Sequence, residues 1–100
     1  MRLTPEQAAL IRSAAAEAFG SDARVWLFGS RADDSKRGGD IDLYVETPQT
    51  SGEAVPRQLR FWSLLQQQLG EQRIDIVMRT ADTRPQPIHE IAHLTGVPLA

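Results

Sequence analysis

The chain has 100 residues, of which 41% are hydrophobic and 24% charged, and it carries a formal net charge of −2 and no cysteine. These values predict one globular domain over residues 1–100, exclude disulfides and thiol chemistry, and argue against an extended basic surface for nucleic acid. The sequence shows neither a secretory signal nor an apolar stretch near the ~20 residues that cross a membrane, so we expect a cytoplasmic protein.

The first predicted element is a helix between Thr4 and Gly20. Thr4 suits the N-cap, Pro5 the first helical position and Gln7 the capping box, and Gly20 marks the end. Its apolar stripe is narrow and consists of Leu10, Ile11, Ala14 and Ala18.

Two strands are predicted next, separated by a polar segment. The continuous apolar run Val25–Phe28 predicts a strand that is buried on both faces and ends at Gly29-Ser30. Residues 31–39 are polar, with a turn at Gly38-Gly39. From 40 to 45 the pattern alternates, so one face is apolar and the other carries Asp40, Asp42 and Tyr44.

The second half of the chain predicts a helix, a strand and a helix. The helix spans 56–69 and ends before Gly70, with an apolar face of Leu59, Trp62, Leu65 and Leu69. The strand spans 73–78, with Asp75 on the face opposite its isoleucines. The last helix spans 88–94, with Ile88, Ile91 and Ala92 directed inward. This order predicts an α/β (α+β) fold, in which a small mixed sheet of three or four strands is covered by helices.

The carboxylates of Asp40 and Asp42 are the strongest chemical signal. Residues i and i+2 of a strand share a face, and two neighbouring carboxylates repel each other unless a cation lies between them. Oxygen ligands of this kind suit Mg²⁺ together with substrate phosphates. If the strand of Asp75 is adjacent, three carboxylates meet, as a two-metal nucleotidyl transfer requires. Taken alone, the pair also fits a solvated strand face.

Gly29-Ser30 is a candidate phosphate-binding turn before these carboxylates. A glycine allows the backbone to approach a ligand closely, and the N–H groups of a following helical turn favour anions. An ordinary turn at the end of a strand is the alternative. Arg31 is a candidate phosphate partner, although a solvated surface position fits it too.

Together, Leu27-Phe28-Gly29-Ser30-Arg31-Ala32 and Gly39-Asp40-Ile41-Asp42-Leu43 resemble the signature of the DNA-polymerase-β-like nucleotidyltransferase superfamily, and Ile74-Asp75-Ile76-Val77 resembles its third carboxylate strand. The resemblance covers nearly the whole chain. It is closest to the minimal nucleotidyltransferase (MNT) branch, whose small members often act as antitoxins beside a HEPN-domain toxin. It therefore implies a polymerase-β-like nucleotidyltransferase fold.

The resemblance also implies roles for individual residues. Gly29 and Ser30 would hold the nucleotide phosphates, with Arg31 beside them, and Asp40, Asp42 and Asp75 would be the catalytic and metal-binding carboxylates. The cofactors implied are two Mg²⁺ ions, with ATP as the substrate. AMP would move to a hydroxyl acceptor, a tyrosine of a HEPN toxin, and this protein adenylyltransferase would act as an antitoxin.

Two other functions are compatible with the same fold. A non-catalytic antitoxin would neutralise its partner by occlusion alone. A small-molecule nucleotidyltransferase is disfavoured, because 100 residues leave no room for a separate acceptor domain, and we therefore expect a partner chain to supply the acceptor. The sequence leaves a homo- or hetero-oligomer open.

The sequence departs from the family pattern at two places. Gly39 stands where a serine is frequent before the first aspartate, and Asp33-Asp34 stand where a basic residue and a glycine are frequent. Two additional acids near a triphosphate weaken its binding by charge repulsion.

A separate motif, His89-Glu90-Ile91-Ala92-His93, matches the H-E-x-x-H pattern of zinc proteases. The position of the next zinc ligand holds Leu99, whereas a catalytic zinc needs three protein ligands. We therefore expect an amphipathic helix with both histidines on its polar side.

Overall fold

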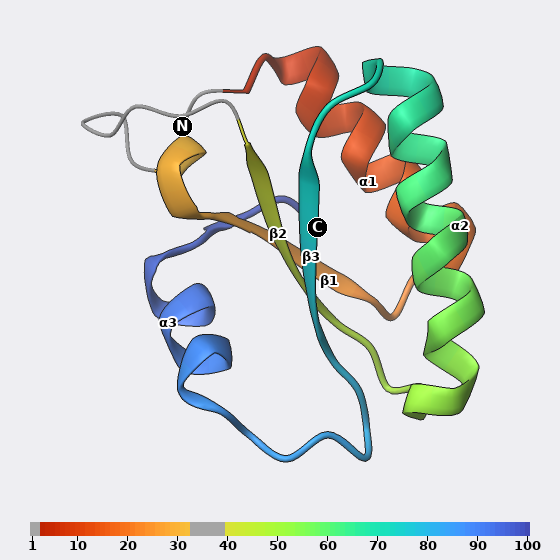
Figure 1. Ribbon diagram of the computed structural model, residues 1–100, viewed down its shortest axis with the longest axis vertical. Coiled ribbons are helices and arrows are strands. Elements are labelled where there is room, and N and C mark those ends of the chain that lie inside the picture. The colour runs from red at the N-terminus through yellow and green to blue at the C-terminus, as the bar shows by residue number, and fades with distance from the viewer. Residues whose placement is uncertain (1–2, 33–39) are drawn as a thin grey trace.

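Four strands form a mixed sheet in the order β3-β2-β1-β4, with helices on both faces (Figure 1). The computed structural model describes residues 3–32 and 40–100. The elements are α1 (Pro5–Phe19), β1 (Arg24–Phe28), the short 3-10 helix η1 (Gly29–Arg31), β2 (Ile41–Glu46), α2 (Ser51–Leu69), β3 (Ile74–Arg79), α3 (Pro87–Thr95) and β4 (Val97–Pro98). The predicted fold class is confirmed.

The sheet combines antiparallel and parallel pairs. β1 is antiparallel to both β2 and β4, and β2 is parallel to β3. β4 was not predicted, because two residues are too few to show an alternating pattern. It pairs with Trp26 and Leu27 and thereby shields the outer edge of β1.

Alternation along β2 separates two apolar clusters. Ile41, Leu43 and Val45 are fully buried with α1 and α2 on one face of the sheet. Tyr44 points to the other face, where it is fully buried in a smaller cluster with Trp26 and Ala92 beneath α3. Because side chains alternate along a strand, Asp42 of β2 and its register partner Asp75 of β3 project from the same face as Tyr44, which is the face that α3 covers.

α1 has the predicted start and end. Thr4 is its N-cap, and the backbone N–H of Gln7 donates to Thr4 Oγ1 at 3.1 Å while the Gln7 side chain accepts from the Thr4 N–H at 3.0 Å. Gly20 closes the helix with φ +93°, a conformation that favours glycine.

α2 begins five residues before the predicted start at Pro56. Thr50 forms a capping box with Glu53, so the helix starts at Ser51 and contains Pro56 in its second turn. Because Pro56 lies beyond the first turn, its missing N–H costs the helix the hydrogen bond to the Gly52 carbonyl, and the helix nevertheless continues through it. The proline was a misleading start signal, since the capping residues lie upstream.

The predicted buried face of α2 was partly wrong. Leu65 is fully buried, but Leu59 and Trp62 are 65% and 42% exposed. The helix is rotated so that Ala54 and Phe61 point inward, and the Phe61 ring meets Phe19 of α1 edge-on at 5.4 Å. Apolar residues lie on two sides of this helix, and the packing against α1 decides which side is buried.

Two predictions concern other parts of the chain. The turn at Gly38-Gly39 lies outside the described residues. None of the helices in the described ranges has both the length and the apolar character that a bilayer crossing requires.

Asp82 ties the loop after β3 to the start of α2. Its carboxylate accepts from the Ser51 N–H at 2.8 Å, from Ser51 Oγ at 2.7 Å and from Thr80 Oγ1 at 2.7 Å. These hydrogen bonds, those from Thr80 and Ser51 foremost, lower the pKa of Asp82 to about 2.

We expect Asp82→Ala to lower Tm by several degrees at neutral pH, because the first turn of α2 loses an acceptor. Since the folded-state pKa lies below the ordinary value of 3.8, the carboxylate stabilises the fold above about pH 4, and this contribution disappears as the pH falls towards 2. Thermal unfolding followed by circular dichroism from pH 7 to pH 2 measures the difference. Glu90→Gln is the control, and a pH-independent difference would contradict the assignment.

Candidate active site

Gly29 forms a turn that only a glycine fits, where β1 ends. Its φ is +73°, and a Cβ there would overlap Asp42 Oδ2 and lie 3.1 Å from Asp42 Cγ. Phe28, the residue before it, is the register partner of Asp42. The absence of a side chain therefore leaves the Asp42 carboxylate room beside the turn.

Asp42 and Asp75 lie side by side on adjacent strands. They are register partners in the parallel β2–β3 pair, so both carboxylates project from the same sheet face. Asp40 precedes β2 by one residue, with its side chain half exposed. The structure thus brings together the three aspartates that the sequence selected.

Arg73 lies between two of these aspartates. Its Nε is 3.7 Å from Asp40 Oδ2 and 3.6 Å from Asp75 Oδ2, and the arginine side chain is 73% exposed. Exposed ion pairs of this length contribute little to stability. The side chain is therefore an exposed counter-charge that these weak ion pairs hold only loosely.

The surroundings of Asp42 disfavour its ionised form. Burial raises its pKa above the ordinary value of 3.8, and the neighbouring charges of Asp75 and then Asp40 raise it further, while Arg73 lowers it. The negative charge of Asp42 is thus held at a place where reduced solvation and the neighbouring carboxylates disfavour it. A bound cation would relieve this repulsion.

The donor set fits magnesium chemically. Among the described residues, no three His, Asp or Glu side chains converge closely enough to hold one ion by themselves. Mg²⁺ needs only one or two protein carboxylates, because water and substrate phosphates complete its octahedral shell. Asp42 with Asp40 or Asp75 provides such a pair, and Gly29 leaves space next to it.

The remaining candidate residues are placed as follows. Ser30 and Arg31 belong to η1, directly after Gly29, and Arg31 is half-buried. The departures at 33–34 and 39 lie outside the described residues. In the backbone, the predicted turn thus follows β1, and Asp42 and Asp75 lie opposite each other on the neighbouring strands β2 and β3.

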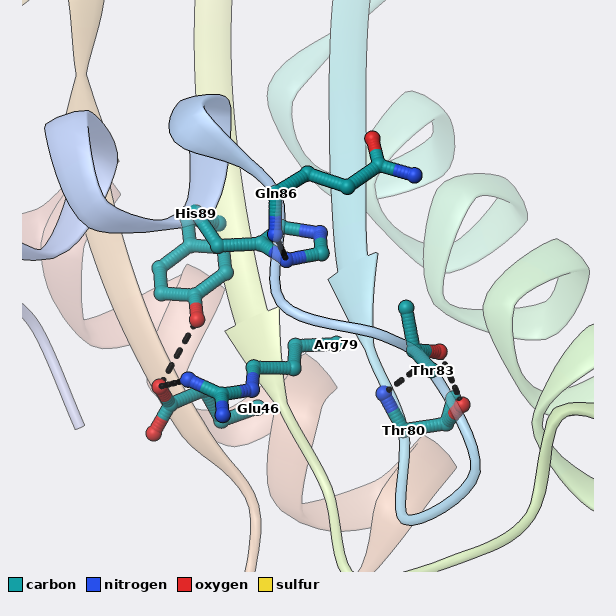
Figure 2. Close-up of polar contacts among 7 residues, drawn as sticks. Glu46, Arg79, Thr80, Thr83, Gln86 and His89 are labelled. Carbon is teal, nitrogen blue, oxygen red and sulfur yellow. Dashed lines mark hydrogen bonds and ion pairs between the residues drawn. The ribbon is translucent and has the colours of Figure 1, made fainter.

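Tyr44 is fully buried, and its hydroxyl group is hydrogen-bonded to Glu46 rather than to the aspartates. Its hydroxyl donates to Glu46 Oε1 at 2.7 Å, and Arg79 Nη1 lies 3.9 Å from the same oxygen (Figure 2). Burial, followed by the hydrogen bond with Glu46, raises the pKa of Tyr44 to about 12. The tyrosine therefore remains a neutral hydrogen-bond donor beneath α3.

The histidines of α3 were predicted on its polar side, and this was wrong for His89. His89 is buried, stacks on Tyr44 with ring centroids 5.8 Å apart, and accepts the Gln86 N–H through Nδ1 at 3.2 Å (Figure 2). His93 meets the Trp26 ring edge-on at 5.0 Å. His93 remains exposed. The prediction that Ile88 and Ile91 point inward was also wrong, because His89 and Ala92 form the buried side of the helix and the two isoleucines are 38% and 54% exposed.

Sequence reasoning assigned no role to Arg73. The signal that could have identified it is spacing, since a residue two positions before Asp75 shares its strand face. Whether the Arg73 guanidinium contacts a carboxylate or only solvent depends on which strand lies next to β3. Only the pairing of β3 with β2 brings Asp40 within reach.

A glycine turn over carboxylates on two neighbouring strands of a small mixed sheet defines a polymerase-β-like nucleotidyltransferase fold. A family model described as a nucleotidyltransferase domain matches residues 9–93. The chain therefore belongs to the nucleotidyltransferase domain family, whose general chemistry is nucleotidyl transfer. A comparison with curated proteins finds no significant match.

We expect Gly29→Ala to lower Tm by roughly 5–10 °C, because a left-handed conformation costs a side-chain-bearing residue about 1–2 kcal/mol and the new Cβ displaces Asp42. Differential scanning calorimetry measures the change. Gly52→Ala is the matched control, since a Cβ there meets nothing within 4 Å. Equal Tm values for the two variants would contradict the close approach of Gly29 to Asp42.

We expect Asp42→Asn to raise Tm at pH 7.5 without divalent cations, because it removes a charge that burial and Asp75 disfavour. Since the folded-state pKa of Asp42 is raised, its ionisation lowers stability, and the advantage of the asparagine should shrink as the pH falls towards 4. Thermal unfolding at several pH values checks this. Asp22→Asn is the control, and a lower Tm for Asp42→Asn would be inconsistent with the repulsion described.

Proposed function

We propose that the chain transfers AMP from ATP to a hydroxyl acceptor, a tyrosine of a HEPN-domain toxin, and thereby acts as an antitoxin. The observation that carries the transfer is the spatial row formed by Gly29, directly after the end of β1, Asp42 of β2 and Asp75 of β3. The tyrosine and the toxin come from the resemblance to MNT proteins. Membership of the nucleotidyltransferase domain family supports the reaction class.

In the proposed reaction the acceptor oxygen attacks the α-phosphorus of ATP. The bond from that phosphorus to the oxygen bridging to the β-phosphate breaks, pyrophosphate leaves, and the hydroxyl proton passes to Asp75. Gly29 and Ser30 would hold the phosphates, and Asp40 and Asp42 would hold Mg²⁺. Magnesium would neutralise charge that develops on the α-phosphate and on pyrophosphate. Arg73 would exchange its carboxylate contacts for the incoming anion.

Exposed apolar side chains support a protein partner. α2 exposes Val55, Leu59 and Trp62, and α3 exposes Ile91 and Leu94, with Leu94 73% exposed. Apolar residues that gather on one helix face in this way typify protein interaction surfaces. A HEPN-domain protein is the partner we propose for them.

Occlusion without catalysis is the second candidate. The exposed apolar residues belong to helices rather than to the aspartate row, so binding through them requires no carboxylate. A partner could then be neutralised by contact alone. The two candidates differ in whether Asp42 is needed.

We expect the HEPN partner to gain the mass of AMP on a tyrosine when it is incubated with the chain, ATP and Mg²⁺. Intact-mass and peptide mass spectrometry measure the modification. Asp42→Asn should reduce its rate at least about tenfold, since the charge that positions the cation is lost. Asp22→Asn serves as the control. An unmodified partner would rule out the proposed transfer.

We expect Asp42→Asn also to fail in neutralising the toxin, because neutralisation depends on transfer in our proposal. Growth of cells that express the toxin together with each variant measures this outcome. Full rescue by Asp42→Asn would favour occlusion instead.

A further inference from the structure

β3 is the end strand of the sheet, and no strand within the described ranges pairs with its outer edge (Figure 1). The Arg73 carbonyl accepts the Ile41 N–H at 3.1 Å and therefore points towards β2. Because successive residues direct their backbone groups to opposite sides of a strand, those of Ile74, Ile76 and Met78 point to the outer edge. Such an edge is a template for a further strand.

An apolar cavity lies beside this edge, between β3 and α2. Its volume is about 370 Å³, within the range of roughly 300–1,000 Å³ typical of ligand pockets. Asp75 borders it, and its apolar lining consists of Val55, Leu59, Trp62, Ile74 and Ile76. The α2 side chains of this lining stay largely exposed, with Val55 64% and Leu59 65% exposed. A small molecule would leave them partly uncovered, whereas a polypeptide that runs along the edge would cover them.

We infer that the acceptor segment of the partner polypeptide binds here as an added β-strand. Two apolar side chains of that segment enter the cavity, next to Ile74 and Ile76. The residue between them projects to the opposite sheet face beside Asp75, because side chains alternate along a strand. That residue is the acceptor tyrosine, so the site selects a tyrosine flanked by apolar residues. This assignment rests on the proposed transfer for the identity of the acceptor.

The same sheet row supports this position for the acceptor. Phe28, Asp42 and Asp75 are successive register partners on β1, β2 and β3. A residue on an added strand would continue the row, with its Cβ about 4.5–5.5 Å from that of Asp75. The Gly29 turn then lies at one end of the row and the acceptor at the other. The carboxylates lie between them, where nucleotide and acceptor must meet.

A second copy of the chain fits this edge less well than a different polypeptide. β3 contains no serine, threonine or tyrosine, so pairing of two β3 strands would present no hydroxyl. An antiparallel pairing centred on Asp75, which would continue the row of Asp42 and Asp75, would also set Asp75 against its own copy, and like charges directly opposite are destabilising. The occupant is therefore a partner segment that carries its own tyrosine.

Two synthetic peptides with lysine flanks test the inference, one with a central Ile-Tyr-Ile and one with Gln-Tyr-Gln. Isothermal titration calorimetry on the full chain should show the first binding at least about tenfold more tightly. Leu59→Lys should weaken its binding at least about tenfold, since the charge enters the cavity wall. The matched control is Gln68→Lys, which places the same charge at an exposed position of α2 outside the cavity and should leave the affinity unchanged.

Three results separate the possible failures. Equal affinity of the two peptides, or unchanged affinity in Leu59→Lys, would overturn the docking edge, even if AMP is transferred to them. The expected affinities without any gain of AMP mass in ATP and Mg²⁺ would overturn the proposed transfer and leave the docking edge in place. A wild-type dimer that Leu59→Lys dissociates in sedimentation would assign the edge to a second copy and overturn the inference.

Discussion

The parallel register of β2 and β3 sets the carboxylates of Asp42 and Asp75 beside each other, and the candidate site depends on this pairing. It is unfavourable by itself, because burial and the neighbouring charges disfavour ionised Asp42. The fold tolerates the repulsion because the opposite faces of the same strands are buried against α1 and α2. Ile41 and Leu43, which flank Asp42, have no exposed surface. Burial of the apolar face thus offsets the repulsion between the carboxylates on the opposite face.

The two ends of the β2–β3 pair differ in how their charges are arranged. At the start of the strands the exposed Arg73 lies within 4 Å of Asp40 and Asp75, two of the three aspartates. At the end, Glu46 accepts a hydrogen bond from Tyr44 and lies near Arg79. Glu46 is paired in this way, whereas at the start the charges of Asp75 and Asp40 each raise the pKa of Asp42 more than Arg73 lowers it. A cation bound beside the glycine turn would relieve this repulsion, and this is the physical basis of the proposed transfer.

The two edges of the sheet also differ from each other. The short strand β4 pairs with the outer edge of β1. The outer edge of β3, in contrast, pairs with no strand in the described residues and lies next to an apolar cavity. Nucleotide, cation and acceptor would then follow one another along a single row of residues. An enzyme built in this way would need little more than its sheet to align the reactants, and its choice of acceptor would depend on the residues that flank the tyrosine.

The sequence by itself determined which residues share a strand face, because side chains alternate with a period of two, and it selected Asp40, Asp42 and Asp75 in this way. It selected Gly29 as a turn at the end of a buried strand. It also determined the capped start of α1. Only the tertiary structure decided that β2 and β3 are neighbours, that Arg73 reaches Asp40, and that Trp62 is exposed while His89 is buried. Strand order and helix rotation depend on packing between segments far apart in the chain, and a helix with apolar residues on two sides does not specify by itself which side is buried.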